Sequence, residues 1–266
     1  MLAPIAIAAA YFGGWPFICA FGVAAIIMLW EWTTLVFGEA EPRALVPGTG
    51  ALVVAAGLVG ESDAAAALAT VALGAVFAAG AVAAWPPRRR RTVHSPAWSA
   101  AGVIYAGTAL LGPALLRADP ALGLAAVVYL FAIVWATDIF AYVVGRAVGG
   151  PLLWPALSPK KTWAGAVAGL GGGVAAGTLV AYASAGTAPL VAGVLALILS
   201  VMAHGGDLVE SAVKRQFGVK DASHLIPGHG GVMDRLDGFL VAALAAVVIG
   251  SLHRGIAAPA LGLLVW

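Results

Sequence analysis

The chain has 266 residues, of which 62% are hydrophobic and only 10% are charged, and its mean hydropathy is +1.00. A soluble domain carries about 25% charged residues, so this composition excludes an ordinary soluble protein and indicates a polytopic membrane protein. The net charge of +2 is too small to suggest nucleic acid as a partner. The single cysteine, Cys19, excludes a disulfide framework and a cysteine metal site.

Apolar runs follow one another along the whole chain, and a membrane-spanning helix needs about 20 such residues. Glycines and prolines separate the runs, which fall near 2–13, 15–37, 44–60, 64–85, 98–116, 121–145, 163–183, 188–205 and 238–252. The N-terminus lacks the basic stretch of a cleaved signal peptide, so the run 2–13 is expected to be the first membrane segment.

These runs predict an all-α polytopic protein with about nine transmembrane helices, forming a single integral membrane domain over residues 1–266. Within it, residues 1–118 would supply the N-terminal membrane helices, and residues 119–254 would supply the helices and loops that carry the polar motifs.

Positive charge predicts how the runs are oriented. Three alternate loops carry most of the basic residues: Arg88 to Arg91, then Arg146, Lys160 and Lys161, and finally Lys214, Arg215, Lys220 and Arg235. Because these loops have the same parity, all three can face the cytoplasm of a cell membrane, with the N-terminus inside and the C-terminus outside. The arginine run is interpreted as a topology anchor, with binding of a nucleotide or an anionic lipid as the alternative.

Glycine recurs at every fourth position in the run 163–183, at Gly165, Gly169, Gly173 and Gly177. This spacing places a glycine stripe on one helix face, where another helix can approach closely. The sequence leaves open whether that helix belongs to the same chain or to a second copy in a homodimer.

A first polar cluster, Asp138 to Arg146, places Asp138, Tyr142 and Arg146 on overlapping faces of a helix. Asp138 is a carboxylate inside a hydrophobic run. It either pairs with Arg146 to close the helix end or faces a cavity at the cytoplasmic mouth.

The second cluster is Ser158-Pro159-Lys160-Lys161-Thr162. Serine is a good N-cap and proline a good first helical residue, so a helix is expected to start at Ser158. Two lysines in its first turn would oppose the helix dipole unless a polyanion, such as a triphosphate or a lipid phosphate, binds there. The alternative is that the lysines only mark the inner face.

The third cluster, residues 200–238, holds nine charged residues of both signs in an otherwise apolar chain. Helical spacing places His204, Asp207, Ser211 and Lys214 on one face. Gly205-Gly206 would break or loosen this helix, and a discontinuous helix at such depth is tolerated where it lines a cavity or is buried in protein.

A glycine-rich loop follows and leads to Asp234 and Asp237, which would lie one turn apart if a helix begins there. Carboxylate oxygens suit Mg²⁺, which takes one or two carboxylates together with substrate phosphates. His229, in the same loop, either binds the metal or bonds a phosphate or the backbone.

The pattern S-x-x-K-R-x4-K-D-x-x-x-L-x-P-G-H-G-G-x-x-D-R-x-D, from Ser211 to Asp237, resembles the signature of the phosphatidate cytidylyltransferase family, also called CDP-diacylglycerol synthases. The clusters around Asp138 and Ser158 are similar to that family too, so the resemblance covers residues 138–238. The chain departs from the family pattern at Ala164, where a glutamate is usual, and at Gly238, where a serine is usual.

The resemblance implies a membrane nucleotidyltransferase that moves the cytidylyl group of CTP to phosphatidic acid, with Mg²⁺ and K⁺ at its metal centre. We expect Asp207 and Asp234 to hold Mg²⁺, with Asp237 as a third or supporting ligand, and Asp207, Asp234, Lys214 and Arg215 to form the catalytic set. The expected substrate-binding residues are Asp138, Arg146, Ser158, Lys160, Lys161, Thr162, Ser211, Lys220, Asp221, His229 and Arg235.

Three other kinds of protein share parts of this pattern. An enzyme that uses CTP on another lipid phosphate, such as an archaeal ether lipid, has motifs that barely differ. A transporter also has broken helices and intramembrane carboxylates, but usually shows paired halves, which are not visible here. A CDP-alcohol phosphatidyltransferase requires DGxxAR and further aspartates, which the continuation after Gly238 does not supply.

Overall fold

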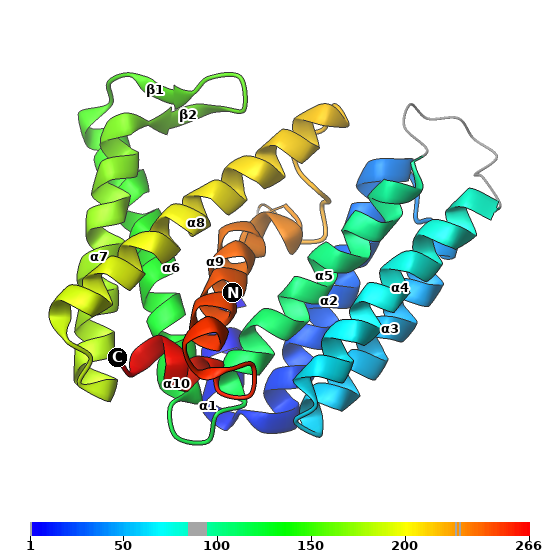
Figure 1. Cartoon of the computed structure of the whole chain (residues 1–266). Helices are drawn as coiled ribbons and strands as arrows, with labels where there is room; N and C mark the ends of the chain where they lie inside the picture. Colours follow the sequence, from blue (N-terminus) through cyan, green and yellow to red (C-terminus); the bar gives the residue numbers. More distant parts are fainter. Residues whose placement is uncertain (1, 85–94, 227, 229) are drawn as a thin grey trace. The chain divides into compact units, whose positions relative to one another are not determined.

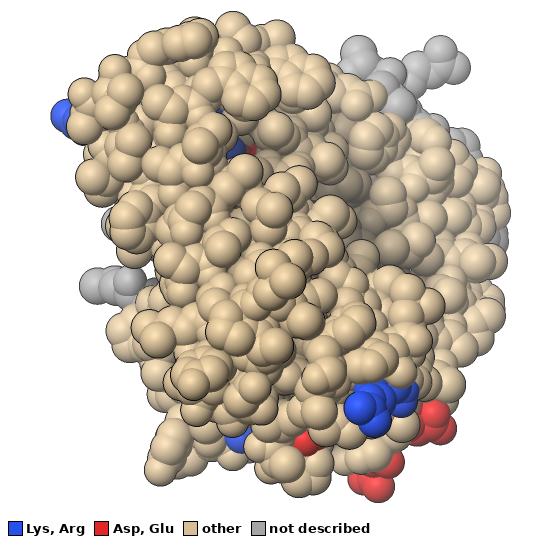
Figure 2. Space-filling model, turned by 60° about the vertical axis from the view of Figure 1, so that its left-hand side comes forward, with Lys and Arg blue, Asp and Glu red and all other residues tan. Residues whose placement is uncertain are grey.

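The computed structural model describes residues 2–84, 95–226, 228 and 230–266. The chain forms two compact units, residues 1–118 with 216–236 and residues 119–215 with 237–266. Eight of the described helices are long and apolar enough to cross a membrane, which confirms the expected all-α polytopic fold. Most of the described surface in view in Figure 2 is formed by residues other than Lys, Arg, Asp and Glu, in keeping with the low content of charged residues.

The first unit is built from helices that lie side by side in Figure 1. In chain order they are α1 (Leu2–Phe12), α2 (Gly14–Phe37), α3 (Pro42–Gly60), α4 (Ala64–Ala84) and α5 (Pro96–Arg117). Fully buried Met28, Leu29 and Leu110 contribute to the apolar core of this unit. The stretch 216–236, which carries much of the polar signature, folds with these helices and not with its sequence neighbours.

The first helix is shorter than the sequence suggests. With 11 residues and a rise of about 1.5 Å per residue, α1 extends roughly half of the ~30 Å needed to cross the hydrocarbon core. Among the residues that the structure describes, eight helices therefore meet the length for crossing, one fewer than the approximate count of nine expected from the sequence. Eight crossings put the two ends of the chain on the same side, whereas nine would put them on opposite sides.

The second unit contains the remaining elements. They are α6 (Gly123–Val148), β1 (Leu152–Trp154), β2 (Ser158–Thr162), α7 (Trp163–Ala185), α8 (Pro189–Gln216), α9 (Met233–Arg254) and α10 (Pro259–Leu264). The first turn of α9 belongs to the first unit and the rest of the helix to the second.

The glycine stripe of α7 packs against α6 within the same chain. A Cβ at Gly165 would lie 2.6 Å from the Ala141 carbonyl oxygen, and one at Gly169 would lie 2.7 Å from that of Thr137. Glycine is therefore required for the close approach of the two helices. The helix that approaches the stripe therefore belongs to the same chain, which is one of the two alternatives expected from the sequence.

The expected helix start at Ser158 is wrong. Residues 158–162 form β2, which pairs antiparallel with β1 through Trp154–Ser158 and Leu152–Thr162. The helix begins at Trp163 instead, where the Thr162 side chain accepts a hydrogen bond from the Gly165 N–H at 3.1 Å. The Ser-Pro signal is overridden because cross-strand pairing satisfies the backbone of this segment. Lys160 and Lys161 thus lie on a hairpin and not in a first helical turn.

The expected break at Gly205-Gly206 is also wrong, because α8 continues unbroken from Pro189 to Gln216. Gly206 serves packing instead: a Cβ there would lie 2.7 Å from the Asp237 carbonyl oxygen of α9. Gly238 does the same from the other side, facing the Ala203 carbonyl oxygen at 2.8 Å. An apolar environment favours the continuous helix, because every backbone polar group is then satisfied internally.

Three long-range contacts agree with the parity of the crossings. The Arg117 side chain, at the end of α5, donates to the Ala10 carbonyl oxygen at 2.7 Å. Thr187, before α8, donates to the Leu264 carbonyl oxygen in α10. The Glu31 carboxylate, near the end of α2, accepts from the Met233 N–H at the start of α9. An even number of spanning helices separates the partners of each pair, so each pair meets on one side of the membrane.

Candidate functional site

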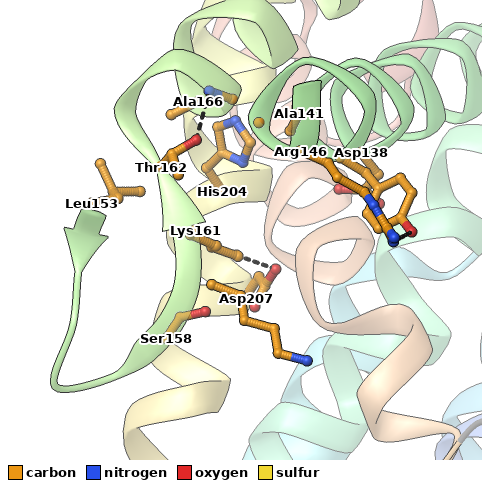
Figure 3. A pocket seen from close by; sticks show the side chains of 14 residues that line it. Asp138, Ala141, Arg146, Leu153, Ser158, Lys161, Thr162, Ala166, His204 and Asp207 are labelled. Atoms are coloured by element: carbon orange, nitrogen blue, oxygen red, sulfur yellow. Dashed lines mark hydrogen bonds and ion pairs between the residues drawn. The ribbon is translucent and has the colours of Figure 1, made fainter. Parts of the chain in front are cut away.

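A cavity of about 640 Å³ opens in the second unit between the β1–β2 hairpin and helices α6, α7 and α8 (Figure 3). Pockets that bind small molecules typically have volumes of about 300–1,000 Å³. Its walls come from two of the predicted polar clusters and the start of a third. The lining residues are Asp138, Ala141, Tyr142, Gly145, Arg146, Leu153, Ser158, Lys160, Lys161, Thr162, Gly165, Ala166, His204 and Asp207.

An ion pair between Lys161 and Asp207 crosses this cavity from the hairpin to α8 (Figure 3). The two side chains are 29% and 33% exposed, so both remain accessible from the cavity. Exposed pairs contribute only about 0–1 kcal/mol to stability, so little free energy opposes the exchange of either partner for a ligand. Lys160, the neighbouring lysine on the hairpin, is exposed and also lines the cavity.

The predicted stripe on α8 forms, but its members differ in their contacts. The Ser211 hydroxyl lies 3.5 Å from the Asp207 Oδ1 atom. The Lys214 ammonium instead pairs with Glu210 on its own helix, with 2.5 Å between Nζ and Oε2 and both side chains nearly buried. Arg215 is exposed at the end of α8.

Three carboxylates of the second unit, Asp138, Asp207 and Asp237, are near enough to interact electrostatically with one another. The Asp237 Oδ1 atom accepts a hydrogen bond from the Gly238 N–H at 2.7 Å. Among the residues that the structure describes, no three His, Cys, Asp or Glu side chains are grouped as a metal cage. The oxygen-rich chemistry nevertheless fits Mg²⁺, which binds through one or two carboxylates plus phosphates and does not need such a cage.

Asp138 lies on the cavity wall, exposed on α6. The Arg146 guanidinium, two turns further along the same helix, donates from Nη1 to the Tyr142 hydroxyl at 3.0 Å. Figure 3 shows Arg146 and Asp138 along one stretch of α6 beside the cavity. The arrangement leaves an acidic group and a basic group facing the same space.

The remaining predicted residues lie in the first unit. Asp234, in the first turn of α9, accepts hydrogen bonds from the Gly231 N–H at 2.7 Å and the Ala222 N–H at 3.0 Å. Arg235, Lys220 and Asp221 are exposed. His229 lies outside the residues that the structure describes, as does the arginine run 88–91.

Two cavity residues and one residue of the first unit were absent from the site predicted from the sequence. His204 belongs to the predicted stripe on α8, and Tyr142 to the predicted face of α6, so helical spacing was the signal for both. Glu31, a fully buried carboxylate in α2, gave no signal beyond being an acid in an apolar run.

The chain is similar in sequence to known proteins. The profile of the cytidylyltransferase family matches residues 1–253. A phosphatidate cytidylyltransferase of Brucella abortus is 52% identical over 155 residues, which are 58% of this chain and 57% of that protein. The enzyme of the same name from Staphylococcus saprophyticus is 41% identical over 119 residues, or 44% of this chain and 46% of that protein.

A third relative, from Staphylococcus haemolyticus, carries the same name and is 36% identical over 154 residues, which are 58% of each chain. The chain therefore spans about half the length of the curated relatives it matches.

Proposed function

The chain belongs to the cytidylyltransferase family, and from this premise we propose that it transfers the cytidylyl group of CTP to phosphatidic acid, for phospholipid synthesis. The observation that carries the proposal is the accessible Lys161–Asp207 pair in a cavity lined by further basic groups, Lys160 and Arg146. Such a cavity combines cations for phosphates with carboxylates for a divalent metal. The names of the relatives support the choice of phosphatidic acid as the acceptor.

The proposed reaction needs no strong base, because the nucleophile is already an anion. An oxygen of the lipid phosphate attacks the α-phosphorus of CTP and forms a new P–O bond. The bond from that phosphorus to the α–β bridging oxygen breaks, and its electron pair leaves with pyrophosphate. Repulsion between the two phosphate groups opposes the approach, so catalysis consists mainly of positioning and charge neutralisation.

The residues of the cavity are suited to this task. Lys161 and Lys160 would bind phosphate oxygens, and Arg146 would supply a planar donor group for a further phosphate. Asp207 would exchange its contact with Lys161 for Mg²⁺, which when bound neutralises phosphate charge and orients the triphosphate. Lys161, no longer paired with Asp207, would then be available to bind substrate phosphate. Asp138 would orient the nucleotide or a water molecule.

The other predicted roles stay part of the proposal. Asp234 would be a second Mg²⁺ ligand, Asp237 a third or supporting ligand, and K⁺ a second cation at the metal centre. Lys214, Arg215 and Arg235 are proposed as phosphate clamps. The proposed orienting residues are Ser158, Thr162, Ser211, Lys220, Asp221 and His229.

The membrane setting follows from the helices. Because the basic loops share one parity, we propose that they face the cytoplasm of the inner membrane, where CTP is present. Phosphatidic acid would then enter the cavity laterally from the inner leaflet. Assembly into a homodimer remains a proposal. The glycine stripe gives it no support, because the stripe already packs against α6 of the same chain.

The test is an assay of the purified chain in detergent with CTP, Mg²⁺ and phosphatidic acid. We expect CDP-diacylglycerol and pyrophosphate in equal amounts, with release of both abolished when either the lipid or Mg²⁺ is left out. The same assay with an ether-linked lipid phosphate in place of phosphatidic acid distinguishes the proposed enzyme from one that uses CTP on another lipid phosphate. No pyrophosphate with either lipid would refute the proposed function.

A further inference from the structure

The proposed chemistry does not use the carboxylate of Glu31. This residue lies near the end of α2 and is fully buried, with 0% of its surface exposed. A charged group in such a place is costly unless hydrogen bonds compensate it. Glu31 accepts three. Its Oε1 atom accepts from the Ser223 hydroxyl at 2.6 Å and from the Val232 N–H at 2.9 Å. Its Oε2 atom accepts from the Met233 N–H at 2.7 Å.

All three donors come from one short stretch, the glycine-rich loop that precedes α9 and the first residue of that helix. The N–H groups at a helix start lack partners inside the helix, and a carboxylate is their favoured acceptor. Glu31 supplies that acceptor from a helix about 200 positions away in sequence. Gly231 leaves the room for it, because a Cβ at that position would collide with Oε1.

Asp234 holds the same loop from inside. Its carboxylate accepts from the Ala222 N–H, before the loop, and from the Gly231 N–H, near its end. Asp234 and Glu31 therefore stabilise different parts of this segment. Asp234 closes the loop on itself, while Glu31 attaches the closed loop and the start of α9 to α2.

We infer that Glu31 is a positioning residue for the cytidylyl transfer: it fixes the start of α9, and with it the signature side chains Asp234 and Arg235 of the first turn, in the orientation that binds the metal and phosphates of the nucleotide. This inference rests on the proposed function, because it concerns the residues to which that function assigns nucleotide and metal binding. In this role Glu31 would act through the loop and would contact neither substrate nor metal.

The experiment compares Glu31→Gln with the wild-type chain in detergent. The Gln side chain has nearly the same shape, but its amide NH₂ replaces one acceptor and leaves a backbone N–H without its partner. A hydrogen bond to a charged group contributes about 1.5–3 kcal/mol, and 1.4 kcal/mol corresponds to tenfold. We therefore expect amide hydrogen exchange at Val232 and Met233 to accelerate by about tenfold or more, and the concentration of Mg²⁺–CTP that half-saturates the enzyme to rise by about tenfold.

The matched control is Glu41→Gln. Glu41 is also buried in the first unit and also caps a helix, accepting from the Arg43 N–H at 3.2 Å at the start of α3. This variant should leave exchange at Val232 and Met233 and the half-saturating concentration unchanged. Ser223→Ala removes one of the three bonds and should shift both readings in the same direction by less, which keeps the inference testable if Glu31→Gln folds poorly.

A merely structural role gives a different result. Glu31→Gln would then reduce the amount of active enzyme, and so the maximal rate per milligram, with an unchanged half-saturating concentration. That result, or unchanged exchange at Val232 and Met233, would overturn the inference. If the wild-type chain forms no CDP-diacylglycerol at all, the proposed function fails instead, and the exchange measurement still shows whether Glu31 holds the loop.

Discussion

The cavity of the second unit and the glycine-rich loop of the first both depend on carboxylates, but they use them in opposite ways. In the cavity, the half-exposed Asp207 pairs with a lysine side chain that is itself accessible. In the loop, the buried Glu31 and the partly buried Asp234 accept hydrogen bonds from backbone N–H groups of the loop itself. A side-chain cation is readily replaced by a ligand, whereas a backbone donor left without its acceptor destabilises the fold.

This difference separates two kinds of carboxylate within the chain. Under the proposed function, the carboxylate on α8 would exchange partners when substrate and metal bind, so its substitution should affect chemistry and leave folding intact. The carboxylates around the loop are part of the structure that presents the signature, so their substitution should affect both.

Asp207→Asn should lower cytidylyl transfer by more than about a hundredfold, because groups that merely support metal ligands already cost 10–100-fold when replaced. Its free energy of unfolding should change by less than about 1 kcal/mol, since the pair with Lys161 is accessible to solvent. Steady-state kinetics at saturating Mg²⁺ and thermal unfolding in detergent measure the two effects.

The matched control for Asp207 is Asp119→Asn, which alters another half-buried carboxylate of the same unit. Asp119 accepts from the Leu122 N–H at 2.8 Å, a bond that the Asn side chain retains. The control should behave like the wild type in both measurements. Full activity of Asp207→Asn would remove this residue from the proposed metal site.

Asp234→Ala should lower both activity and stability. The N–H groups of Ala222 and Gly231 would lose their acceptor, and an unsatisfied buried donor costs about 1–3 kcal/mol. We expect a fall of about 2–3 kcal/mol in the free energy of unfolding, seen as a lower midpoint in thermal unfolding, beside the loss of transfer. Asp221→Ala, an exposed acid of the same stretch, should leave stability unchanged. A stable but inactive Asp234→Ala would assign Asp234 to the chemistry alone and break the comparison.

Most of the helices were predictable from the sequence, because in a membrane the apolar run itself defines the element. The expected runs 15–37, 64–85 and 163–183 lie within a few residues of α2, α4 and α7. Prediction failed where local signals competed with long-range contacts. Ser158-Pro159 has the sequence of a helix start, but pairing with β1 makes it a strand. Gly205-Gly206 suggests a break, but the close packing of α9 explains the glycine at 206 within an intact helix.

Part of the lining of the cavity was predictable as well. Asp138, Lys161 and Asp207 came from three clusters in the sequence, and the structure brings all three to one cavity. The position of the loop was not predictable, because its anchor Glu31 lies in a different part of the chain and has no motif around it. A single acid in an apolar run specifies a buried partner, but not which one.

The walls of the cavity depend on the close packing of α6 and α7. A substitution that separates these helices therefore tests the role of the cavity without altering a charge. Gly169→Ala would place a Cβ 2.7 Å from the Thr137 carbonyl oxygen, and overpacking of this kind costs about 1–3 kcal/mol. Gly171→Ala is the matched control, since a Cβ there meets nothing within 4 Å. We expect only Gly169→Ala to lower the unfolding midpoint and to weaken CTP binding. Equal effects of the two variants would mean that helix propensity, and not the α6–α7 contact, determines the outcome.

The smallest effect should come from Thr162, which ends β2 and caps α7. Thr162→Val keeps the shape of the side chain but removes the hydroxyl that accepts from the Gly165 N–H, and loss of an N-cap costs about 1 kcal/mol. Thr162→Ser keeps the acceptor and should stay within a few tenths of a kcal/mol of the wild type. Thermal unfolding of both variants in detergent measures the difference. If the valine variant is as stable as the serine variant, the hydroxyl of Thr162 does not contribute to stability, and pairing with β1 is enough to hold the hairpin against α7. The hydroxyl would then be grouped with the cavity side chains, such as Asp207, that can change partners.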